Sequence, residues 1–571
     1  MNILGINSFF EHPSVALIVD GELVFAIEEE RLTRVKHGKA YSPYTAYLPY
    51  ASIYAALKFS GLNAADITNV AYSYNGAKHI RASITGALGG RRIKSLRQEI
   101  AAYMSLKNVR RELVENHILP VRYHDFWRRG DFASARFQEW DHHLSHAASA
   151  FYCSGFDRSL VIVADGRGEG SCTSVYIGNG GKLTKIASVD LPHSLGFLYS
   201  HLTYHLGFQP FEDEYKVMGL AAYGEPEFSS EMAQIIELLP EGRYRLNSSA
   251  TSNLGGLLGP VRKSWEPLEQ RHKNIARSVQ GALEEALEHV VSHHLAQTGE
   301  RNLCVAGGTF LNCVANARLS LLPAVDGFFV QPAAHDGGTA IGAAALTWSA
   351  AGKSPQLRYS SMLLGTEWSD EAIERALKET NLAYSRRSNQ ELIDETAKLL
   401  HDEYVVAFFQ GRMEFGPRAL GARSFLASPR SARTRERLNI MKAREQFRPL
   451  APLVLDEHFD TYFEGRQNRY MMLAVKAKEA TQISAPAIVH ADGTSRVQVV
   501  REQDDKLLFA ILTGFASKSG LPILINTSLN IRGKPIDESP IDAVASAVCS
   551  GVDAIVIGSF IVDLKRGREA A

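Results

Sequence analysis

Residues 160–177 read Leu160-Val-Ile-Val-Ala-Asp-Gly-Arg-Gly-Glu-Gly-Ser-Cys-Thr-Ser-Val-Tyr-Ile177, which is an apolar run, a glycine-rich turn and a second β-type run. A third run follows at 183–189 after the turn Gly178-Asn-Gly-Gly181, so the stretch predicts an antiparallel β-meander. The start of the chain repeats this order around Asp20-Gly21, with expected strands at 2–7, 15–19 and 22–27. Two matching meanders predict a duplicated α/β unit whose two lobes enclose a cleft.

Helical periodicity and turn residues divide the rest of the chain. The expected long helices of the first part lie at 50–59, 93–116 and 274–299. Polar residues with Gly and Pro at 350–358 indicate a linker. The expected elements beyond it are helices at 370–380 and 391–403 and a strand at 405–409. Because 571 residues are too many for one hydrophobic core, we expect two domains, at 1–350 and 359–571.

Composition narrows the classes of function. Acidic and basic residues balance at 62 each, and no basic, aromatic-rich stripe occurs, which argues against a nucleic-acid partner. No apolar run approaches the roughly 18 residues that cross a bilayer, and the first residues resemble a strand rather than a signal peptide, so no membrane partner is expected. The 5 cysteines form no Cys-x-x-Cys pair, which favours reduced, buried thiols in a cytoplasmic protein.

Two histidines lie four residues apart in the helical stretch Trp140-Asp-His-His-Leu-Ser-His-Ala-Ala-Ser-Ala-Phe151. At this spacing, His142 and His146 share one helix face and can bind the same metal ion. We expect Asp336, in the turn His335-Asp-Gly-Gly338, to be the third ligand. The alternative is that the histidines only solvate or cap the helix.

Glycine-rich turns follow two of the expected strands, at 165–170 and 307–312. Glycines let backbone N–H groups approach phosphate oxygens, and the helix that follows adds its dipole. Neither turn fits the Walker or dinucleotide pattern, so each alone is also compatible with a tight structural turn. Lys216, in Glu214-Tyr-Lys-Val-Met-Gly219, is compatible with a phosphate or adenine contact.

The second half places basic residues in apolar, glycine-punctuated segments rather than on a face of mixed charge. These residues are Arg412, Arg418, Arg423, Lys442, Arg444, Arg448 and Arg496. Arginines in such surroundings bind dense anionic charge by bidentate contacts. The segment Asn526-Thr-Ser-Leu-Asn530 follows an expected strand at 522–525 and offers amide and hydroxyl groups. The alternative is a structural network of arginines and carboxylates with a capping segment.

Several longer motifs occur in order over nearly the whole chain. They include Glu29-Glu-Arg-Leu-Thr-Arg-Val-Lys-His37, His-His-Leu-Ser-His-Ala, Gly-Gly-Thr-Phe-Leu-Asn, Gly-Pro-Arg-Ala-Leu-Gly and Asn-Thr-Ser-Leu-Asn. In this order they resemble the O-carbamoyltransferase family of nodulation-factor and antibiotic biosynthesis. The resemblance implies an α/β protein with a duplicated N-terminal domain of the actin-like ATPase superfold (ASKHA), similar to the tRNA threonylcarbamoyl-transfer subunit. It also implies a smaller, YrdC-like α/β domain similar to the threonylcarbamoyl-AMP synthase.

The same resemblance implies a two-step reaction. The C-terminal domain is expected to make carbamoyl-adenylate from carbamoyl phosphate and ATP with Mg²⁺, and the N-terminal domain to transfer the carbamoyl group to a hydroxyl of a small molecule. Carried over by motif, His142, His146 and Asp336 would bind Fe²⁺ or a similar divalent metal. The expected adenylate ligands are Gly166, Gly168, Lys216, Gly307, Gly308 and Asn312. The expected ligands of carbamoyl phosphate and the ATP phosphates are Arg418, Arg448, Arg496, Asn526, Ser528 and Asn530.

Three residues are expected to act in catalysis. Arg418 would neutralise charge during adenylate formation. The acceptor hydroxyl needs a base, for which His12 and His143 are candidates, and His12 is favoured because it lies at the first strand turn, facing the expected cleft. Two other classes of function remain open: a phosphotransferase or ATPase of the actin superfold, which would form ADP, and a nucleotide-binding or RNA-modification module, which would need a basic surface. The residues do not fix the acceptor, and a homodimer is compatible with them.

Overall fold

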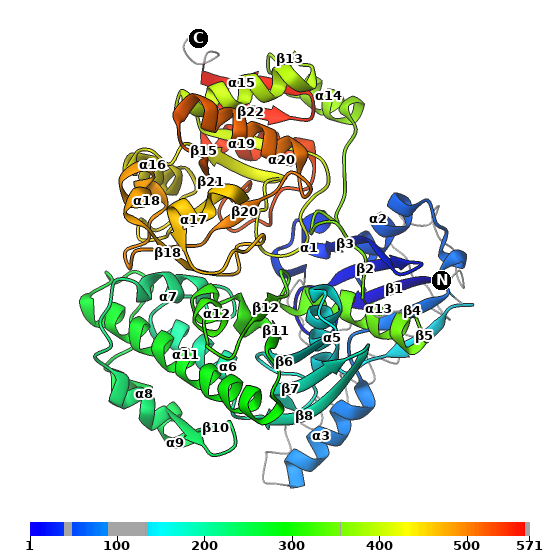
Figure 1. Cartoon of the computed structure of the whole chain (residues 1–571), viewed down its shortest axis with the longest axis vertical. Helices are drawn as coiled ribbons and strands as arrows, with labels where there is room; N and C mark the ends of the chain where they lie inside the picture. The colour runs from blue at the N-terminus through cyan, green and yellow to red at the C-terminus, as the bar shows by residue number, and fades with distance from the viewer. Residues whose placement is uncertain (39–47, 89–131, 133, 354–355, 566–571) are drawn as a thin grey trace.

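Three large β-sheets organise the chain, which is seen here in a computed structural model that describes residues 1–38, 48–88, 132, 134–353 and 356–565. Two sheets have 5 strands each and the third has 8 (Figure 1). The mixed α/β fold class is therefore confirmed. The predicted helix at 93–116 lies outside the described residues. Within the described part of the chain, no helix combines the length and apolar character needed to cross a membrane.

Both five-stranded sheets have the same strand order. In each, the first strand of an antiparallel meander lies at the centre and two parallel strands follow on its other side. The first sheet comprises β3 (Glu22–Glu28), β2 (Ser14–Val19), β1 (Asn2–Asn7), β4 (Asn69–Tyr72) and β5 (Arg136–Glu139). The second comprises β8 (Lys182–Asp190), β7 (Ser171–Asn179), β6 (Arg158–Ala164), β11 (Asn302–Ala306) and β12 (Gly327–Val330). The six predicted meander strands are confirmed.

Two helices lie between these sheets. α13 (Thr339–Ala350) packs on the first sheet, α5 (His142–Ser154) packs on the second, and the two helices contact each other. Small residues make this approach possible, because a Cβ atom at Gly342 would lie 1.7 Å from the carbonyl oxygen of Ser145. The helix pair therefore brings the histidines of α5 beside the turn that precedes α13.

We expect Gly342→Ala to lower the free energy of unfolding by about 3 kcal/mol. The added methyl group would collide with the backbone of α5, and the collision can be relieved only by moving the two helices apart. Gly281→Ala is the matched control, since this helical glycine of α11 (Gln270–Thr298) has only the end of the Arg277 side chain nearby, at 3.8 Å. The control should be neutral or stabilising, by up to about 1 kcal/mol. Urea denaturation of the two variants measures the difference, and equal stabilities would contradict this account of the helix packing.

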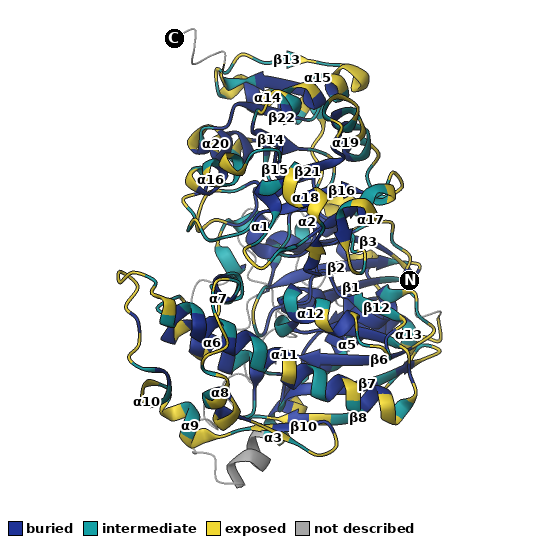
Figure 2. Cartoon of the chain, turned by 60° about the vertical axis from the view of Figure 1, so that its left-hand side comes forward, coloured by how far each residue is buried: buried dark blue, intermediate teal, exposed yellow. Residues whose placement is uncertain are grey.

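The third sheet is built from residues after the predicted linker and has its central strands buried (Figure 2). Its strands, in spatial order, are β13 (Ser385–Arg386), β23 (Phe560–Asp563), β22 (Ala554–Ile557), β14 (Val406–Phe409), β15 (Arg423–Ala427), β21 (Ile523–Ser528), β16 (Ala451–Leu455) and β20 (Gln498–Val500). The flanking helices include α14 (Asp370–Glu379), α15 (Asn389–His401) and α19 (Lys506–Ser519). The predicted helices 370–380 and 391–403 are confirmed with small shifts of their ends.

The strand predicted at 522–525 was too short. β21 continues to Ser528 because Asn526 pairs in register with Leu426 of β15 on one side and Ala451 of β16 on the other. The polar residues Asn526 and Ser528 therefore lie within the sheet instead of following it.

Residues 357–364, which begin at the end of the predicted linker, are bound to the first sheet. They run along β3, where the Leu23 N–H donates to the Arg358 carbonyl oxygen (2.9 Å) and the Ala26 N–H donates to that of Leu364 (3.0 Å). On the other side of these residues, the Phe415 N–H donates to the carbonyl oxygen of Met362 (2.8 Å). This segment therefore joins the first sheet to the loop that contains Arg418.

A short helix strengthens the same junction. In α1 (Glu29–Thr33), Arg31 Nη2 donates to the carbonyl oxygen of Gly416 (2.8 Å), and the N–H of Gly416 donates to Glu28 Oε1 (2.8 Å). Arg34, just after the helix, donates to the carbonyl oxygen of Ile536 (2.6 Å). The N-terminal residues thus pack directly on the third-sheet region.

The cysteines follow the prediction with one exception. All 5 are free, and four of them are buried, but Cys549 is exposed. Its helix, α20 (Pro540–Ser550), turns that position toward solvent, so the expectation of buried thiols is wrong for this residue.

Candidate metal centre and cationic pocket

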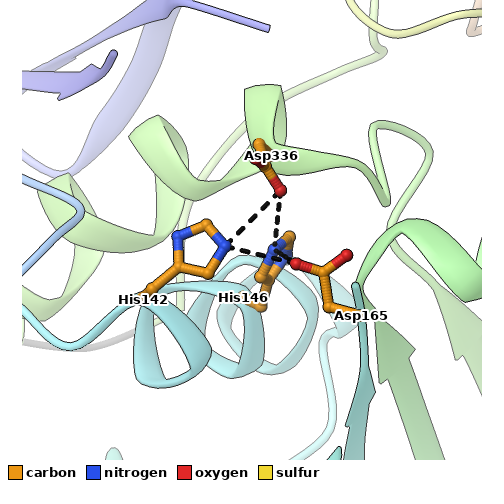
Figure 3. Close-up of side chains that lie close together, drawn as sticks. All are labelled: His142, His146, Asp165 and Asp336. Atoms are coloured by element: carbon orange, nitrogen blue, oxygen red, sulfur yellow. Dashed lines mark hydrogen bonds and ion pairs between the residues drawn. The ribbon is translucent and has the colours of Figure 1, made fainter. Parts of the chain in front are cut away.

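Four side chains converge between the two five-stranded sheets, and Figure 3 shows how their donor atoms face one another. His142 and His146 extend from the first turns of α5, whose start is fixed by the Asp141 carboxylate, which accepts from the Leu144 N–H (2.7 Å). Nε2 of His142 lies 3.4 Å, and Nε2 of His146 3.5 Å, from Asp336 Oδ1. The predicted trio of His142, His146 and Asp336 is therefore brought together.

Asp165 is a fourth member of this group that the metal prediction left out. It directly follows β6, and its Oδ2 lies 3.3 Å from His142 Nε2 and 3.6 Å from His146 Nε2. The position of Asp165 in the sequence could have indicated this role. It follows a central strand, and side chains at the carboxyl ends of neighbouring parallel strands lie at the same edge of the sheet. In the sequence, Asp165 is recognisable only as the start of a glycine-rich turn.

The electrostatics of the four residues suit a cation. Burial opposes ionisation of Asp336, but His142 and His146 outweigh it and hold the pKa of this carboxyl well below its usual range. The pKa of Asp165 is lowered as well, although burial and Asp336 oppose it, because both imidazoles face it. Among the described residues, neither ring nitrogen of the buried His146 has a conventional hydrogen bond. Two imidazoles and two carboxylates form a donor set that fits a divalent transition metal such as Fe²⁺ or Zn²⁺. We call His142, His146, Asp165 and Asp336 the metal-type group.

The glycine turns lie beside this group. The Gly308 N–H donates to Asp165 Oδ1 (3.1 Å), and Gly307, with φ 102°, packs so tightly that a Cβ would lie 2.2 Å from the Ala164 carbonyl oxygen. In the other turn, Phe197 covers Gly166, and the Gly168 N–H donates to the Ser171 carbonyl oxygen (2.8 Å). Both turns are therefore held close to the metal-type group, and part of their backbone N–H capacity is used internally.

Two predicted adenylate ligands make contacts within the protein. Asn312 caps α12 (Cys313–Ser320) by accepting from the Ala315 N–H (3.0 Å), and its amide nitrogen donates to Gln280 Oε1 (2.8 Å). Lys216 Nζ lies 3.0 Å from Asp213 and 3.1 Å from Glu445, which belongs to the second half. Lys216 thus joins the first half of the chain to Glu445, which also lies 3.9 Å from Arg448.

The two candidate bases lie in different surroundings. His143 points away from the metal-type group, because its Nδ1 lies 2.8 Å from Ser174 Oγ and its ring contacts Gly168. Burial lowers the pKa of His143 to about 3. His12 stacks on His335 with 4.3 Å between ring centroids, beside the Asp336 turn. Only His12 therefore lies on the side of the group that carries Asp336.

A cluster of cationic side chains lies next to the turn at 307–312, and we use the name cationic pocket for these side chains. Its members are Arg418, Lys442, Arg444, Arg448 and Arg496. Arg418 Nη2 donates to the carbonyl oxygen of Leu311 (3.2 Å). Within the described residues, the shielded Nε atoms of Arg418 and Arg496 have no partner. The cationic pocket therefore contains hydrogen-bond donors without a partner among the described residues, beside the turn at 307–312 of the first half.

Mutual repulsion in the cationic pocket shows in the pKa values. Burial, together with Arg496, lowers the pKa of Arg418 to about 9, and burial with Arg448 lowers that of Arg444 to about 9. Burial and Arg444 lower the pKa of Lys442 well below its usual value. Five cations this close together, with Glu445 and Asp537 as the neighbouring carboxylates, fit a polyanionic ligand.

The polar segment at the end of β21 borders the same pocket. Lys442 Nζ donates to Asn530 Oδ1 (3.0 Å), and Ser528 Oγ donates to the same oxygen (2.6 Å). Asn526 lies deeper, where its amide donates to Gln498 Oε1 (3.0 Å) and the Ala419 carbonyl oxygen (2.9 Å). Ser528 and Asn530 therefore contact a member of the cationic pocket from the sheet side, whereas the amide nitrogen of the buried Asn526 is bonded within the protein.

Two of the arginines singled out in the sequence have structural contacts instead. Arg412 Nη2 donates to the Val24 carbonyl oxygen (2.8 Å), and its guanidinium lies over the Phe59 ring. Arg423 donates to the Gln410 carbonyl oxygen (2.7 Å) and stacks on Phe409. For these two residues, the alternative of a structural role is the one that the contacts support.

Together, the fold and these groups define an α/β protein that pairs an imidazole–carboxylate centre with a cationic pocket. Comparison with known proteins agrees: the carbamoyltransferase N-terminus matches residues 2–345 and the carbamoyltransferase C-terminus matches residues 397–564. Nodulation protein NolNO of Sinorhizobium fredii is 35% identical over 98% of this chain and 80% of its own. Nodulation protein NolO of Bradyrhizobium diazoefficiens is 37% identical over 74% of this chain and 78% of its own. The chain belongs to the carbamoyltransferase family, which confirms the predicted resemblance and makes the protein a transferase.

Solved structures give a weaker likeness. HypF of T. kodakarensis is 14% identical, covers 60% of this chain and 46% of its own, and has a TM-score of 0.31. Full-length HypF in its phosphate- and nucleotide-bound form is also 14% identical, with 45% and 51% covered and a TM-score of 0.28. Scores this low carry no argument about this chain.

Proposed function

We propose that this protein is an ATP-dependent O-carbamoyltransferase that works in two steps at two adjoining sites. In the first step, carbamoyl phosphate and water give carbamate and phosphate, and a carbamate oxygen then attacks the α-phosphorus of ATP, releasing pyrophosphate and forming carbamoyl-adenylate. In the second step, a hydroxyl of a small molecule attacks the carbamoyl carbon and AMP leaves. Carbamoyl-adenylate is the intermediate that joins the two steps.

The contact of Arg418 with Leu311 carries this proposal. It places the cationic pocket directly against the turn at 307–312, whose Gly308 N–H bonds to Asp165 of the metal-type group. An adenylate formed in the pocket therefore has a short way to the second site. Carbamoyl-adenylates hydrolyse easily, so a short interior transfer limits their loss to water.

The roles of the two parts follow from their residues. Residues 359–571 form the adenylating, YrdC-like domain, where Arg418, Arg448 and Arg496 neutralise the phosphates of ATP, bound with Mg²⁺, and of carbamoyl phosphate. Asn526, Ser528 and Asn530 complete that pocket from the sheet side. Residues 1–350 form the duplicated, actin-like transfer domain, in which the repeated strand order supports the assignment.

The transfer site uses both glycine turns and the metal-type group. The backbone of Gly166, Gly168, Gly307 and Gly308 borders the adenylate, with Lys216 and Asn312 at its edge. His142, His146, Asp165 and Asp336 would hold a divalent metal such as Fe²⁺, which would supply Lewis acidity toward the carbamoyl or phosphate oxygens. His12 promotes loss of the proton from the acceptor hydroxyl, and it is better placed than His143 because it borders the Asp336 turn.

The deciding experiment incubates the full chain with ATP, Mg²⁺ and carbamoyl phosphate without an acceptor. We expect pyrophosphate to be released only when carbamoyl phosphate is present, together with a product that contains AMP. Release of ADP, or pyrophosphate release independent of carbamoyl phosphate, would favour a phosphotransferase or ATPase and contradict the proposal. Chromatography of the nucleotide products distinguishes these results.

A further inference from the structure

A second group of metal-ligating side chains lies close to the first. It consists of His12, in the loop between β1 and β2, Glu30 in α1, and His37 in the short helix η1 (Lys36–Gly38). One donor atom from each of the three lies within 4.8 Å of the others. This second group adjoins the metal-type group, because His12 stacks on His335 and the Glu11 N–H donates to Asp336 Oδ2 (2.8 Å).

Local backbone geometry directs these side chains together at a conformational cost. His12 has φ 50° and His37 has φ 63°, so both histidines occupy the left-handed region that residues other than glycine rarely adopt. Such strain persists where the surrounding structure fixes it, and it is frequent at functional sites. The two strained histidines belong to different loops, yet their rings lie 4.9 Å apart.

Two members of the group, Glu30 and His37, have free capacity for a cation. Glu30 is buried, and it accepts from the His37 N–H (2.6 Å) and pairs with Arg31 Nη1 (3.2 Å), which leaves lone pairs on both oxygens. Neither ring nitrogen of His37 has a well-aligned hydrogen bond within the described residues, although Nε2 lies 3.3 Å from Glu212 Oε1.

Charge in the surroundings also favours a cation. The buried guanidinium of Arg31 lies between two buried carboxylates, Glu28 (3.5 Å) and Glu30 (3.2 Å), so one guanidinium faces two negative charges. Glu212 adds a third, partly exposed carboxylate at the outer side of His37, where Lys36 Nζ also lies 3.9 Å from it. Buried charge of this kind requires a partner to offset its desolvation.

We propose that His12, Glu30 and His37 form a second divalent-cation site, separate from the metal-type group, with Glu212 positioned to become a fourth ligand. Two imidazoles with one or two carboxylates suit Zn²⁺ or Co²⁺ rather than Mg²⁺ or Ca²⁺, which prefer oxygen ligands alone. Binding at this site does not depend on the proposed reaction. Its consequence does: an ion ligated by His12 would lower the pKa of an acceptor hydroxyl, so His12 would act through the ion rather than as a free base.

The test counts metal ions in the full chain. Protein stripped with a chelator is titrated with Co²⁺, whose visible absorption reports binding and geometry, and bound metal is measured by elemental analysis. We expect two equivalents for the wild type, and one each for His37→Gln, Glu30→Gln and His146→Gln. The control His458→Gln, which removes a half-exposed histidine beside Glu457, should keep two equivalents.

The outcomes separate this inference from the proposed function. A wild-type value of one equivalent would overturn the second site without reference to any variant. So would two equivalents in both His37→Gln and Glu30→Gln. The single equivalent that remains in these variants shows that they are folded, and the count is unaffected by whether the protein transfers a carbamoyl group.

Discussion

Replacing Arg418 by methionine will lower pyrophosphate release from ATP and carbamoyl phosphate by about 10³-fold or more, while the protein stays folded. Loss of a single positioned donor to a developing charge typically costs about 10² to 10³ in rate. We expect a loss at or above the upper end of this range for Arg418, because it remains charged at neutral pH with a pKa of about 9 and its Nε has no partner among the described residues. Pyrophosphate release under saturating substrates measures the effect.

Stability separates this role from a structural one. Arg418 lies among like charges, and Arg496 is the neighbour that most lowers its pKa after burial itself. An apolar side chain should therefore leave the free energy of unfolding unchanged or raise it. Arg532→Met is the matched control, since this arginine pairs with Glu445 at the rim (3.5 Å) with an exposed side chain. A rate for Arg418→Met within tenfold of the control would contradict the proposed adenylation pocket.

Replacing His146 by alanine will impair carbamoyl transfer and spare adenylate formation, the reverse of what we expect at Arg418. Carbamoyl transfer should fall by about 10³-fold or more, whereas pyrophosphate release should stay within about twofold, because His146 faces Asp165 and Asp336 and not the cationic pocket. The acceptor for this assay is the compound on which the wild type acts in a panel of sugar, polyketide, alkaloid and peptide hydroxyls. Labelled carbamoyl phosphate follows both half-reactions.

Two comparisons make the His146 result interpretable. His201→Ala, an exposed position on α6 (Leu195–His205), should leave both half-reactions unchanged. Elemental analysis should show that His146→Ala has lost one bound metal ion. Equal loss of both half-reactions in folded His146→Ala would show that the two sites do not divide the chemistry as proposed.

Local pattern was sufficient for much of the fold and for part of the centre. The meanders and the helix with two histidines are set by short-range periodicity, so the sequence predicted them. Asp165 was missed because its role depends on β6 lying next to β11, which brings it to Gly308 and the α5 histidines. That neighbour relation joins residues about 140 positions apart in the chain, and no local pattern encodes it.

The same limit explains the errors at strand ends. β21 extends through polar residues because strands on both sides offer partners to Asn526, and side-chain polarity alone indicated that the strand would stop. Arg412 and Arg423 had the same local pattern as Arg418, yet carbonyl groups of distant loops bind them. Whether an arginine is used structurally is decided by what the fold places in front of it.

The segment 357–364 has a consequence for any attempt to divide this protein. It lies after the predicted domain end at 350, yet it supplies the hydrogen-bonding neighbour for the outer edge of β3 through Leu23 and Ala26. A fragment that stops at 350 would present that edge uncovered, and uncovered edges recruit other chains. Carrying the cut past residue 364 keeps the edge paired within the fragment, so residues 357–364 are better regarded as part of the edge of the first sheet than as a tether.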